Sequence, residues 1–340
     1  MTVAPRHEAL CGTACAIRYM MKRPSVPHVP GICRTGGPWL ERLLNTTALF
    51  KESAPFVFFN VGANKGYAVA QTLQTLASAK FTNRDWQEAM WDHLKERRLY
   101  NQFSEGRSCG PCKLCRTNVT RLGSLHVESH AFEMMPEIYT WLQWAFAKFQ
   151  IAGAVTHAAV TNASGTAINF VTVADHAQQF GWESSRTIHA SESAEQMRNK
   201  RHSSGRSQVT ISVPSLSLDD YMRQKQIGHV HYMQVDVEMQ EANVLRGLRH
   251  TLSRRAVDVI ELELGGSGWE GADVNATLHW LSRKSYSCLW QSAECLVPYS
   301  GPCYVDFRDL KGGNIVCAHG EALDGLRRSI CKPNCVREST

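Results

Sequence analysis

The sequence predicts an α/β fold with a mainly parallel sheet and helices on both faces, and three observations carry this prediction. The segment Phe56–Tyr67 combines an apolar run, a glycine turn and the start of a helical pattern. Strand-like and helix-like segments then alternate from residue 126 to residue 264. Polar side chains stand at or near the ends of several strand-like segments. Because ligands bind at the carboxyl ends of strands in such sheets, these side chains mark a predicted crevice.

The 340 residues are enough for one large domain or two small ones, and an apolar fraction of 43% supplies a sizeable core. The net charge of +6 is mild, and the sequence has no dense run of Lys and Arg with interleaved aromatic residues. We therefore expect no nucleic-acid partner. No apolar stretch approaches the roughly 18 residues that span a bilayer. Residues 9–16 are too short and interrupted for a signal peptide, although a fragment of a longer chain would lack its targeting segment.

We expect a domain at residues 50–318, preceded by an N-terminal extension at 1–49 and followed by an exposed C-terminal tail at 319–340. Within the domain, residues 80–125 interrupt the α/β rhythm and are interpreted as a Cys-rich insertion. Residues 175–207 are polar and without periodicity, which predicts a long, lid-like loop.

The elements follow from local patterns. Continuous apolar runs and β-branched segments predict strands at 56–59, 126–133, 155–160, 167–173, 230–236 and 256–264. Apolar residues at helical spacing predict helices at 67–78, 136–149 and 244–252. Short helices are expected at 36–44 and 218–222, and a polar helix-like piece at 85–98. A further helix and closing strands are expected between 270 and 318.

Gly62 and Gly66 frame the turn after the first strand. Glycine has no Cβ, so the backbone turns sharply there and a ligand can approach closely. The helix that follows points its free N–H groups at the same crevice. The spacing Gly-x-x-x-Gly differs from the dinucleotide pattern Gly-x-Gly-x-x-Gly, which disfavours an NAD-type oxidoreductase and leaves another adenosine-type ligand open. The alternative is an ordinary strand-to-helix turn.

Carboxylates and one amide gather at the predicted crevice. Glu133, at the end of the second strand, is placed to accept hydrogen bonds from ribose hydroxyls; its alternative is a favourable charge at a helix N-terminus. Asp236, Glu238, Glu261 and Glu263 would repel one another, which raises at least one pKa and makes a general base near neutral pH. Their hard oxygens could instead bind Mg²⁺ or Ca²⁺, or cap helices and pair with arginines; we assign no metal ligand among them.

Four blocks in this order resemble the FkbM-type S-adenosylmethionine-dependent methyltransferases, over about residues 56–264. Phe59–Gly66 is similar to the cofactor loop Asp-x-Gly-Ala-Asn-x-Gly, and Ala131–Pro136 to Phe-Glu-Pro-x-Pro. Leu218–Tyr221 matches Leu-Asp-x-Tyr, and Val235–Gly247 is similar to Asp-x-Glu-Gly-x-Glu-x-x-x-Leu-x-Gly. The resemblance implies a Rossmann-like class I methyltransferase fold.

The resemblance also implies an activity: methyl transfer from S-adenosylmethionine to a hydroxyl of a sugar, a glycan or a small hydroxylated acceptor. Asp236 would lie nearest the chemistry, with Glu238 and Glu261 assisting. The cofactor would be bound by five residues, namely Asn60, Gly62, Asn64, Gly66 and Glu133.

Three positions depart from the family pattern. Asn60 replaces an Asp and carries no charge, Met134 replaces a Pro, and Met239 replaces a Gly at a turn where a side chain would crowd access. Asn60 and Met239 favour an alternative function, a catalytically silent binding or interaction module that retains the methyltransferase fold.

Cysteines and sequons together favour the lumen of the secretory pathway over the cytoplasm, because disulfides and glycans belong there. The chain has 12 cysteines. Asn-x-Ser/Thr sequons occur at Asn45, Asn118, Asn162 and Asn275, and predict a glycoprotein.

The densest cysteines are Cys109, Cys112 and Cys115. A disulfide-stitched insertion is the favoured interpretation. A structural zinc completed by His126 or His130 is the alternative, and a redox Cys-x-x-Cys pair is another.

Overall fold

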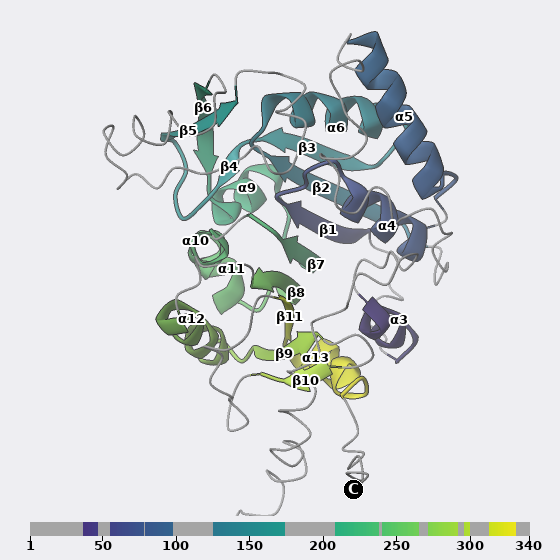
Figure 1. The fold of residues 1–340 in the computed structure, drawn as a ribbon. Helices are drawn as coiled ribbons and strands as arrows, with labels where there is room; N and C mark the ends of the chain where they lie inside the picture. Colours follow the sequence, from purple (N-terminus) through teal and green to yellow (C-terminus); the bar gives the residue numbers. More distant parts are fainter. Residues whose placement is uncertain are drawn as a thin grey trace, which may run out of the picture.

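The computed structural model describes residues 37–46, 55–77, 79–97, 125–173, 208–237, 240–264, 271–291, 296–299 and 313–330 (Figure 1). Its main sheet has eight strands in the order β10-β9-β11-β8-β7-β1-β2-β3. The strand bounds are β1 Phe56–Val61, β2 Val127–Glu133, β3 Gly153–His157, β7 Val230–Val235, β8 Val257–Leu264, β9 Ser287–Gln291, β10 Leu296–Pro298 and β11 Gly313–Ala318.

The sheet is parallel where the site lies and antiparallel at one edge. Strands β8, β7, β1, β2 and β3 pair in parallel, whereas β11 pairs antiparallel with β8 and β9, and β10 with β9. Sequence analysis predicted the parallel part and the class I α/β fold, and the structure confirms both. The carboxyl ends of the five parallel strands therefore lie on the same side of the sheet, where a ligand can contact several of them.

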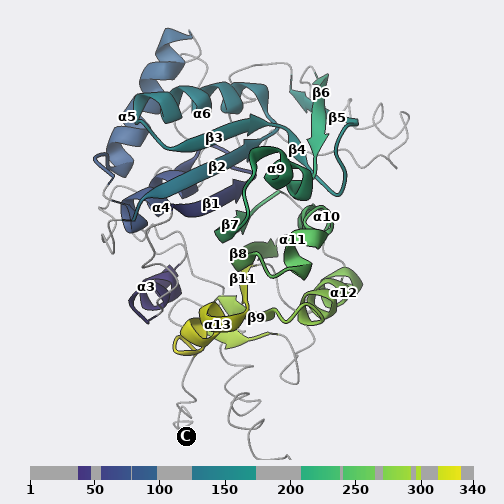
Figure 2. The ribbon, with the colours of Figure 1, turned by 180° about the vertical axis from the view of Figure 1, so that it is seen from behind.

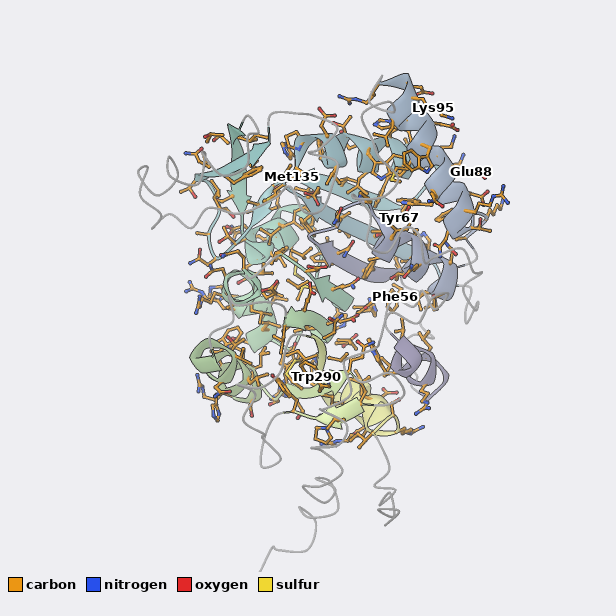
Figure 3. The ribbon with its side chains drawn as sticks, in the orientation of Figure 1. Phe56, Tyr67, Glu88, Lys95, Met135 and Trp290 are labelled. Carbon is orange, nitrogen blue, oxygen red and sulfur yellow. A yellow bond between two sulfur atoms is a disulfide. The ribbon has the colours of Figure 1, made fainter. Side chains whose placement is uncertain are left out.

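Helices cover both faces of this sheet, as Figures 1 and 2 show, and Figure 3 adds the side chains. One core lies under α3, α4, α5, α6 and α13, and the other under α9, α10, α11 and α12. Neighbouring strand residues alternate between the two cores: Phe58 belongs to the first and Phe59 to the second. The helix bounds are α3 Gly37–Thr46, α4 Tyr67–Leu76, α5 Asn83–Glu96, α6 Pro136–Lys148, α9 Leu218–Lys225, α10 Glu241–Arg246, α11 Arg249–Ser253, α12 Gly271–Ser282 and α13 Gly320–Arg327.

Helix α5 falls inside the segment that was expected to be an insertion, yet it belongs to the core. Thr82 and Asp85 form a capping box at its start, which fixes where the helix begins. Trp86, Met90 and Leu94 are fully buried in the core shared with α4 and α6. The rest of the segment, from residue 98 to residue 124, lies outside the described residues.

The C-terminal segment also differs from its expected exposed tail. Helix α13 buries Ala322, Leu323 and Leu326, and it packs against α3 and β11. Apolar residues at helical spacing explain this packing, because the helix can bury one face against the sheet. Residues 331–340 lie outside the described part, and the outer limits of the domain stay predictions.

A second, three-stranded sheet was not predicted as a unit. Its order is β4-β6-β5, formed by β4 Ala159–Val160, β6 Gln208–Leu216 and β5 Ala167–Val173. Strand β6 pairs in parallel with β4 and antiparallel with β5. The expected lid at 175–207 connects β5 to β6 in the sequence and lies outside the described residues.

Candidate functional site

The turn after β1 is wedged between the ends of β2 and β7. Gly62 has a φ of +79°, and a Cβ built on it would lie 1.8 Å from the carbonyl oxygen of Asp236. The amides of Gly62 and Ala63 both donate to the carbonyl oxygen of Phe132, at 3.1 and 2.9 Å. Only glycine fits at this position, because the backbone is left-handed and the neighbouring chain occupies the space of a side chain.

Glu133 fastens the middle of this turn. Its Oε2 accepts a hydrogen bond from the Asn64 amide at 2.8 Å, and its Oε1 accepts one from the Met135 amide at 2.8 Å. Asn64 has a φ of +47°, a conformation that asparagine tolerates better than most residues. Burial raises the pKa of Glu133, and the backbone hydrogen bonds act in the opposite direction. A carboxylate has about four lone-pair positions, so Glu133 can accept from a further donor besides these backbone amides.

Two tryptophans hold the last part of the turn. The carbonyl oxygen of Lys65 accepts hydrogen bonds from the indole N–H of Trp86 at 2.9 Å and of Trp141 at 3.0 Å. Gly66 has a φ of +77°, and the side chains of Trp86 and Leu142 occupy the space that a Cβ on this residue would need. Helices α5 and α6 thereby shape the turn, which sequence analysis did not predict. A lone tryptophan in an amphipathic helix gives no signal that it contacts a distant loop.

Polar residues form a row across the three central strands. The register places Asn60 opposite Gln234, and Gln234 opposite Glu261. Asn60 is only 2% exposed. Within the described part of the chain, its Oδ1 and the Oε1 of Gln234 are buried without a hydrogen-bond partner. Two buried acceptors without donors on neighbouring strands are costly, which is the pattern expected where a ligand supplies the donors.

Glu261 ends the row but is engaged. It is 2% exposed, it accepts a hydrogen bond from the hydroxyl of Tyr232, and it accepts another from Asn314 Nδ2 at 3.0 Å. Burial raises the pKa of this carboxyl above its ordinary value. Asp236 differs from Glu261 in its burial, because it is exposed directly after β7; its amide donates to the Val61 carbonyl at 2.9 Å.

The predicted residues thus meet in one place with two exceptions. Gly62 and Gly66 make the turn, Asn64 bonds to Glu133, and Asp236 contacts the turn through its backbone. Glu261 lies two strands from Asn60, on β8. Glu238 lies outside the described residues, as does Met239.

The structure adds Glu241 to the neighbourhood of Asp236. It is 1% exposed at the start of α10, and its Oε1 accepts a hydrogen bond from the Val237 amide at 3.1 Å. Sequence analysis included this residue in a family block without giving it a role. Its contact shows that it fixes the backbone just after Asp236.

A family comparison agrees with this geometry. The model of the methyltransferase FkbM domain matches residues 108–288, which is more than half of the chain. The chain belongs to the FkbM methyltransferase family. In coarse terms, membership of this family implies that the chain carries out methylation that depends on S-adenosylmethionine. The matched range of this FkbM protein contains Glu133 and Asp236 but not the turn after β1.

The residues present fit S-adenosylmethionine. The glycine turn offers backbone where a Cβ would fill the space, and the buried Oδ1 of Asn60 is an acceptor without a donor among the described residues. Glu133 offers carboxylate oxygens at the end of β2, and an acidic residue bonds to ribose hydroxyls in dinucleotide-binding α/β folds. These groups complement a ligand rich in hydrogen-bond donors.

Solved structures of methyltransferases are similar to this FkbM chain at low identity. A methyltransferase FkbM from Methylobacillus flagellatus KT is 10% identical; the match covers 90% of this chain and 58% of that one, with a TM-score of 0.35. A precorrin-6y C5,15-methyltransferase from Geobacter metallireducens GS-15 is 8% identical, with coverages of 87% and 93% and a TM-score of 0.32. No curated protein matches the chain in sequence.

The remaining expectations concern cysteines and the membrane. Cys109, Cys112 and Cys115 lie outside the described residues. His130, one of the two alternative fourth zinc ligands, is 3% exposed and bonded to Tyr221 and Glu128, so its nitrogens are engaged within the fold. In the part of the chain that the structure describes, no helix has the length and apolarity to cross a membrane.

Proposed function

We propose that this FkbM protein is an O-methyltransferase that transfers the methyl group of S-adenosylmethionine to a hydroxyl of a sugar, a glycan or a small hydroxylated acceptor. One observation carries the proposal: the turn anchored by Glu133 runs directly against Asp236, an exposed carboxylate. The residues that suit the cofactor therefore adjoin a group that can accept a proton.

The proposed roles follow from burial. Asn60 and Glu133 are buried acceptors and bind the cofactor's donors. The cofactor, when bound, supplies a methyl group already activated by its sulfonium. The chain must then align the acceptor hydroxyl in line with the methyl–sulfur bond and remove its proton. Asp236 holds that proton on a carboxylate oxygen while the acceptor oxygen gains the methyl group.

Glu261 and Glu238 assist in this proposal, but not as equals of Asp236. Both carboxylate oxygens of Glu261 are engaged, by Tyr232 and Asn314. It therefore acts as a positioning residue that fixes the polar row beside Asn60 and Gln234. For Glu238 the proposal rests on the family block alone.

Binding calorimetry with S-adenosylmethionine followed by transfer of labelled methyl to a panel of glycans and small hydroxylated compounds tests this function. The proposal expects binding and transfer to at least one acceptor. Asp236→Ala should bind the cofactor and transfer nothing; retained turnover would end its assignment as the base.

The second candidate is a silent module that keeps the fold. Asn60 favours it, because a neutral amide attracts a cationic cofactor less strongly than a carboxylate does. Absence of S-adenosylmethionine binding in the calorimeter would support this candidate and reject the first.

We also propose a luminal setting and a glycoprotein. Cys288 and Cys317 support it, because they lie opposite each other in β9 and β11 and form a disulfide. Among the sequons, Asn162 is exposed. Glycosidase treatment of protein from a secretory cell should increase its mobility on a gel; unchanged mobility would contradict glycosylation.

A further inference from the structure

We propose a divalent transition-metal site formed by His229, His231 and Asp258. One candidate ligand atom from each of these residues lies within 4.8 Å of the other two. The cluster sits where β7 and β8 begin, whereas the glycine turn follows the end of β1. Since β1, β7 and β8 are parallel, the cluster lies at the amino ends of these strands and the methyltransferase site at their carboxyl ends.

Strand register brings the three side chains together. Val230 pairs with Val257 and Tyr232 with Val259, so His231 is opposite Asp258 on the neighbouring strand. His229 precedes His231 by two residues, the spacing that returns to the same side of a strand. The two imidazole rings lie with their centroids 5.0 Å apart. The arrangement is therefore set by the sheet itself and not by a flexible loop.

The site is anchored on one side and accessible on the other. Asp258 is 4% exposed, and its Oδ2 lies 2.8 Å from Nε2 of His229. The side chain of His229 is 42% exposed, which gives an ion access from solvent. The buried carboxylate supplies a negative charge and an oxygen ligand, and the half-exposed imidazole supplies a nitrogen ligand. A bound ion would replace the direct contact between His229 and Asp258.

The donor set indicates which ions bind. Two imidazole nitrogens and one carboxylate oxygen suit Zn²⁺, Co²⁺ or Ni²⁺, and the borderline-soft nitrogens disfavour Mg²⁺ and Ca²⁺. Three protein ligands leave coordination positions for water. We infer a stabilising role, because the ion would link the starts of β7 and β8 and lies away from Asp236.

Binding has a specific consequence at Val57. The Val57 amide donates to Nδ1 of His231 at 2.9 Å, which requires that nitrogen to be unprotonated. A metal ion on Nδ1 takes the lone pair that accepts this bond. A metal ion on Nε2 moves the ring proton to Nδ1, with the same result. In either case the Val57 amide loses its acceptor, so its NMR signal reports occupancy of this site.

The cysteines of the chain require a probe that distinguishes ligands. Thiolates bind Co²⁺ with intense sulfur-to-metal charge-transfer absorption, whereas a nitrogen and oxygen site shows only weak visible bands. We would therefore titrate the full chain with Co²⁺ and compare His229→Ala, His231→Ala and Asp258→Asn with His250→Ala. His250 is an exposed histidine on α11 and serves as the matched control.

The proposal expects one Co²⁺ per chain without thiolate absorption for the wild type and for His250→Ala. Each of the three ligand variants should bind at least about tenfold more weakly. Should a variant fail to fold, the wild type still decides, because Zn²⁺ must shift the Val57 amide signal. Equal affinity in the ligand variants, or an unchanged Val57 signal at saturating Zn²⁺, would overturn the site.

Discussion

Gly62 and Asp236 are in such close contact that a Cβ on Gly62 would lie 1.8 Å from the carbonyl oxygen of Asp236. The two residues are 174 positions apart in sequence, yet the amide of Asp236 also bonds to Val61, beside the glycine. This contact ties the proposed cofactor turn to the proposed base. A substitution at Gly62 should therefore affect both cofactor binding and the position of the proposed base.

Gly62→Ala should weaken S-adenosylmethionine binding and destabilise the fold by more than a positive φ alone costs. The matched control is Gly165→Ala, because Gly165 has a φ of +88° and no atom of the described residues lies within 4 Å of its missing Cβ. The control should lose about 1–2 kcal/mol from the left-handed backbone alone. Urea unfolding and calorimetry measure both effects. Equal losses in the two variants would contradict the close contact.

Glu133→Gln should loosen the same turn while conserving its shape. The amides of Asn64 and Met135 bond to different oxygens of Glu133, and in glutamine one of these oxygens becomes an NH₂ group that cannot accept. One of the two backbone amides therefore loses its partner, at about 1–3 kcal/mol. We expect lower stability and weaker cofactor binding. Glu88→Gln is the control, because its ion pair with Arg84 is exposed and exposed pairs contribute little. Wild-type affinity in Glu133→Gln would remove this residue from the site.

Glu261 predicts a pH dependence. Burial raises its pKa above 4.5, so the folded protein holds the proton to a higher pH than the unfolded chain does. Its contribution to stability is complete below pH 4.5 and is lost as the pH rises through the raised value. Glu261→Gln should therefore gain stability relative to the wild type as the pH rises from 4.5 towards neutrality. Urea unfolding at several pH values measures this difference; a constant difference would show that Glu261 does not titrate as a buried carboxyl.

The local features of the site could be predicted from the sequence. An apolar run followed by Gly62 and Gly66 specifies a strand and a turn, and Glu133 at the end of the next strand follows from parallel order. These features are determined by residues that are close in sequence, so the sequence pattern is sufficient to predict them.

Features that depend on register could not be predicted in this way. Gln234 faces Asn60 only because β7 pairs with β1 in one register, and Trp86 reaches Lys65 only when α5 packs on the turn. The cluster at His229 arises likewise from the pairing of β7 with β8. For β6, a signal did exist, since Val209, Ile211 and Val213 alternate with polar residues.

The central claim is that this FkbM protein moves a methyl group from S-adenosylmethionine to oxygen, and one measurement tests it most directly. The wild type and Asp236→Ala would be incubated with cofactor labelled with ¹³C in its methyl group and with the acceptor panel, and the products examined by NMR. We predict a labelled methoxy carbon on an acceptor for the wild type, and cofactor binding without product for Asp236→Ala. A cofactor-binding wild type that labels no acceptor oxygen, or a variant that labels as fast as the wild type, would contradict the account.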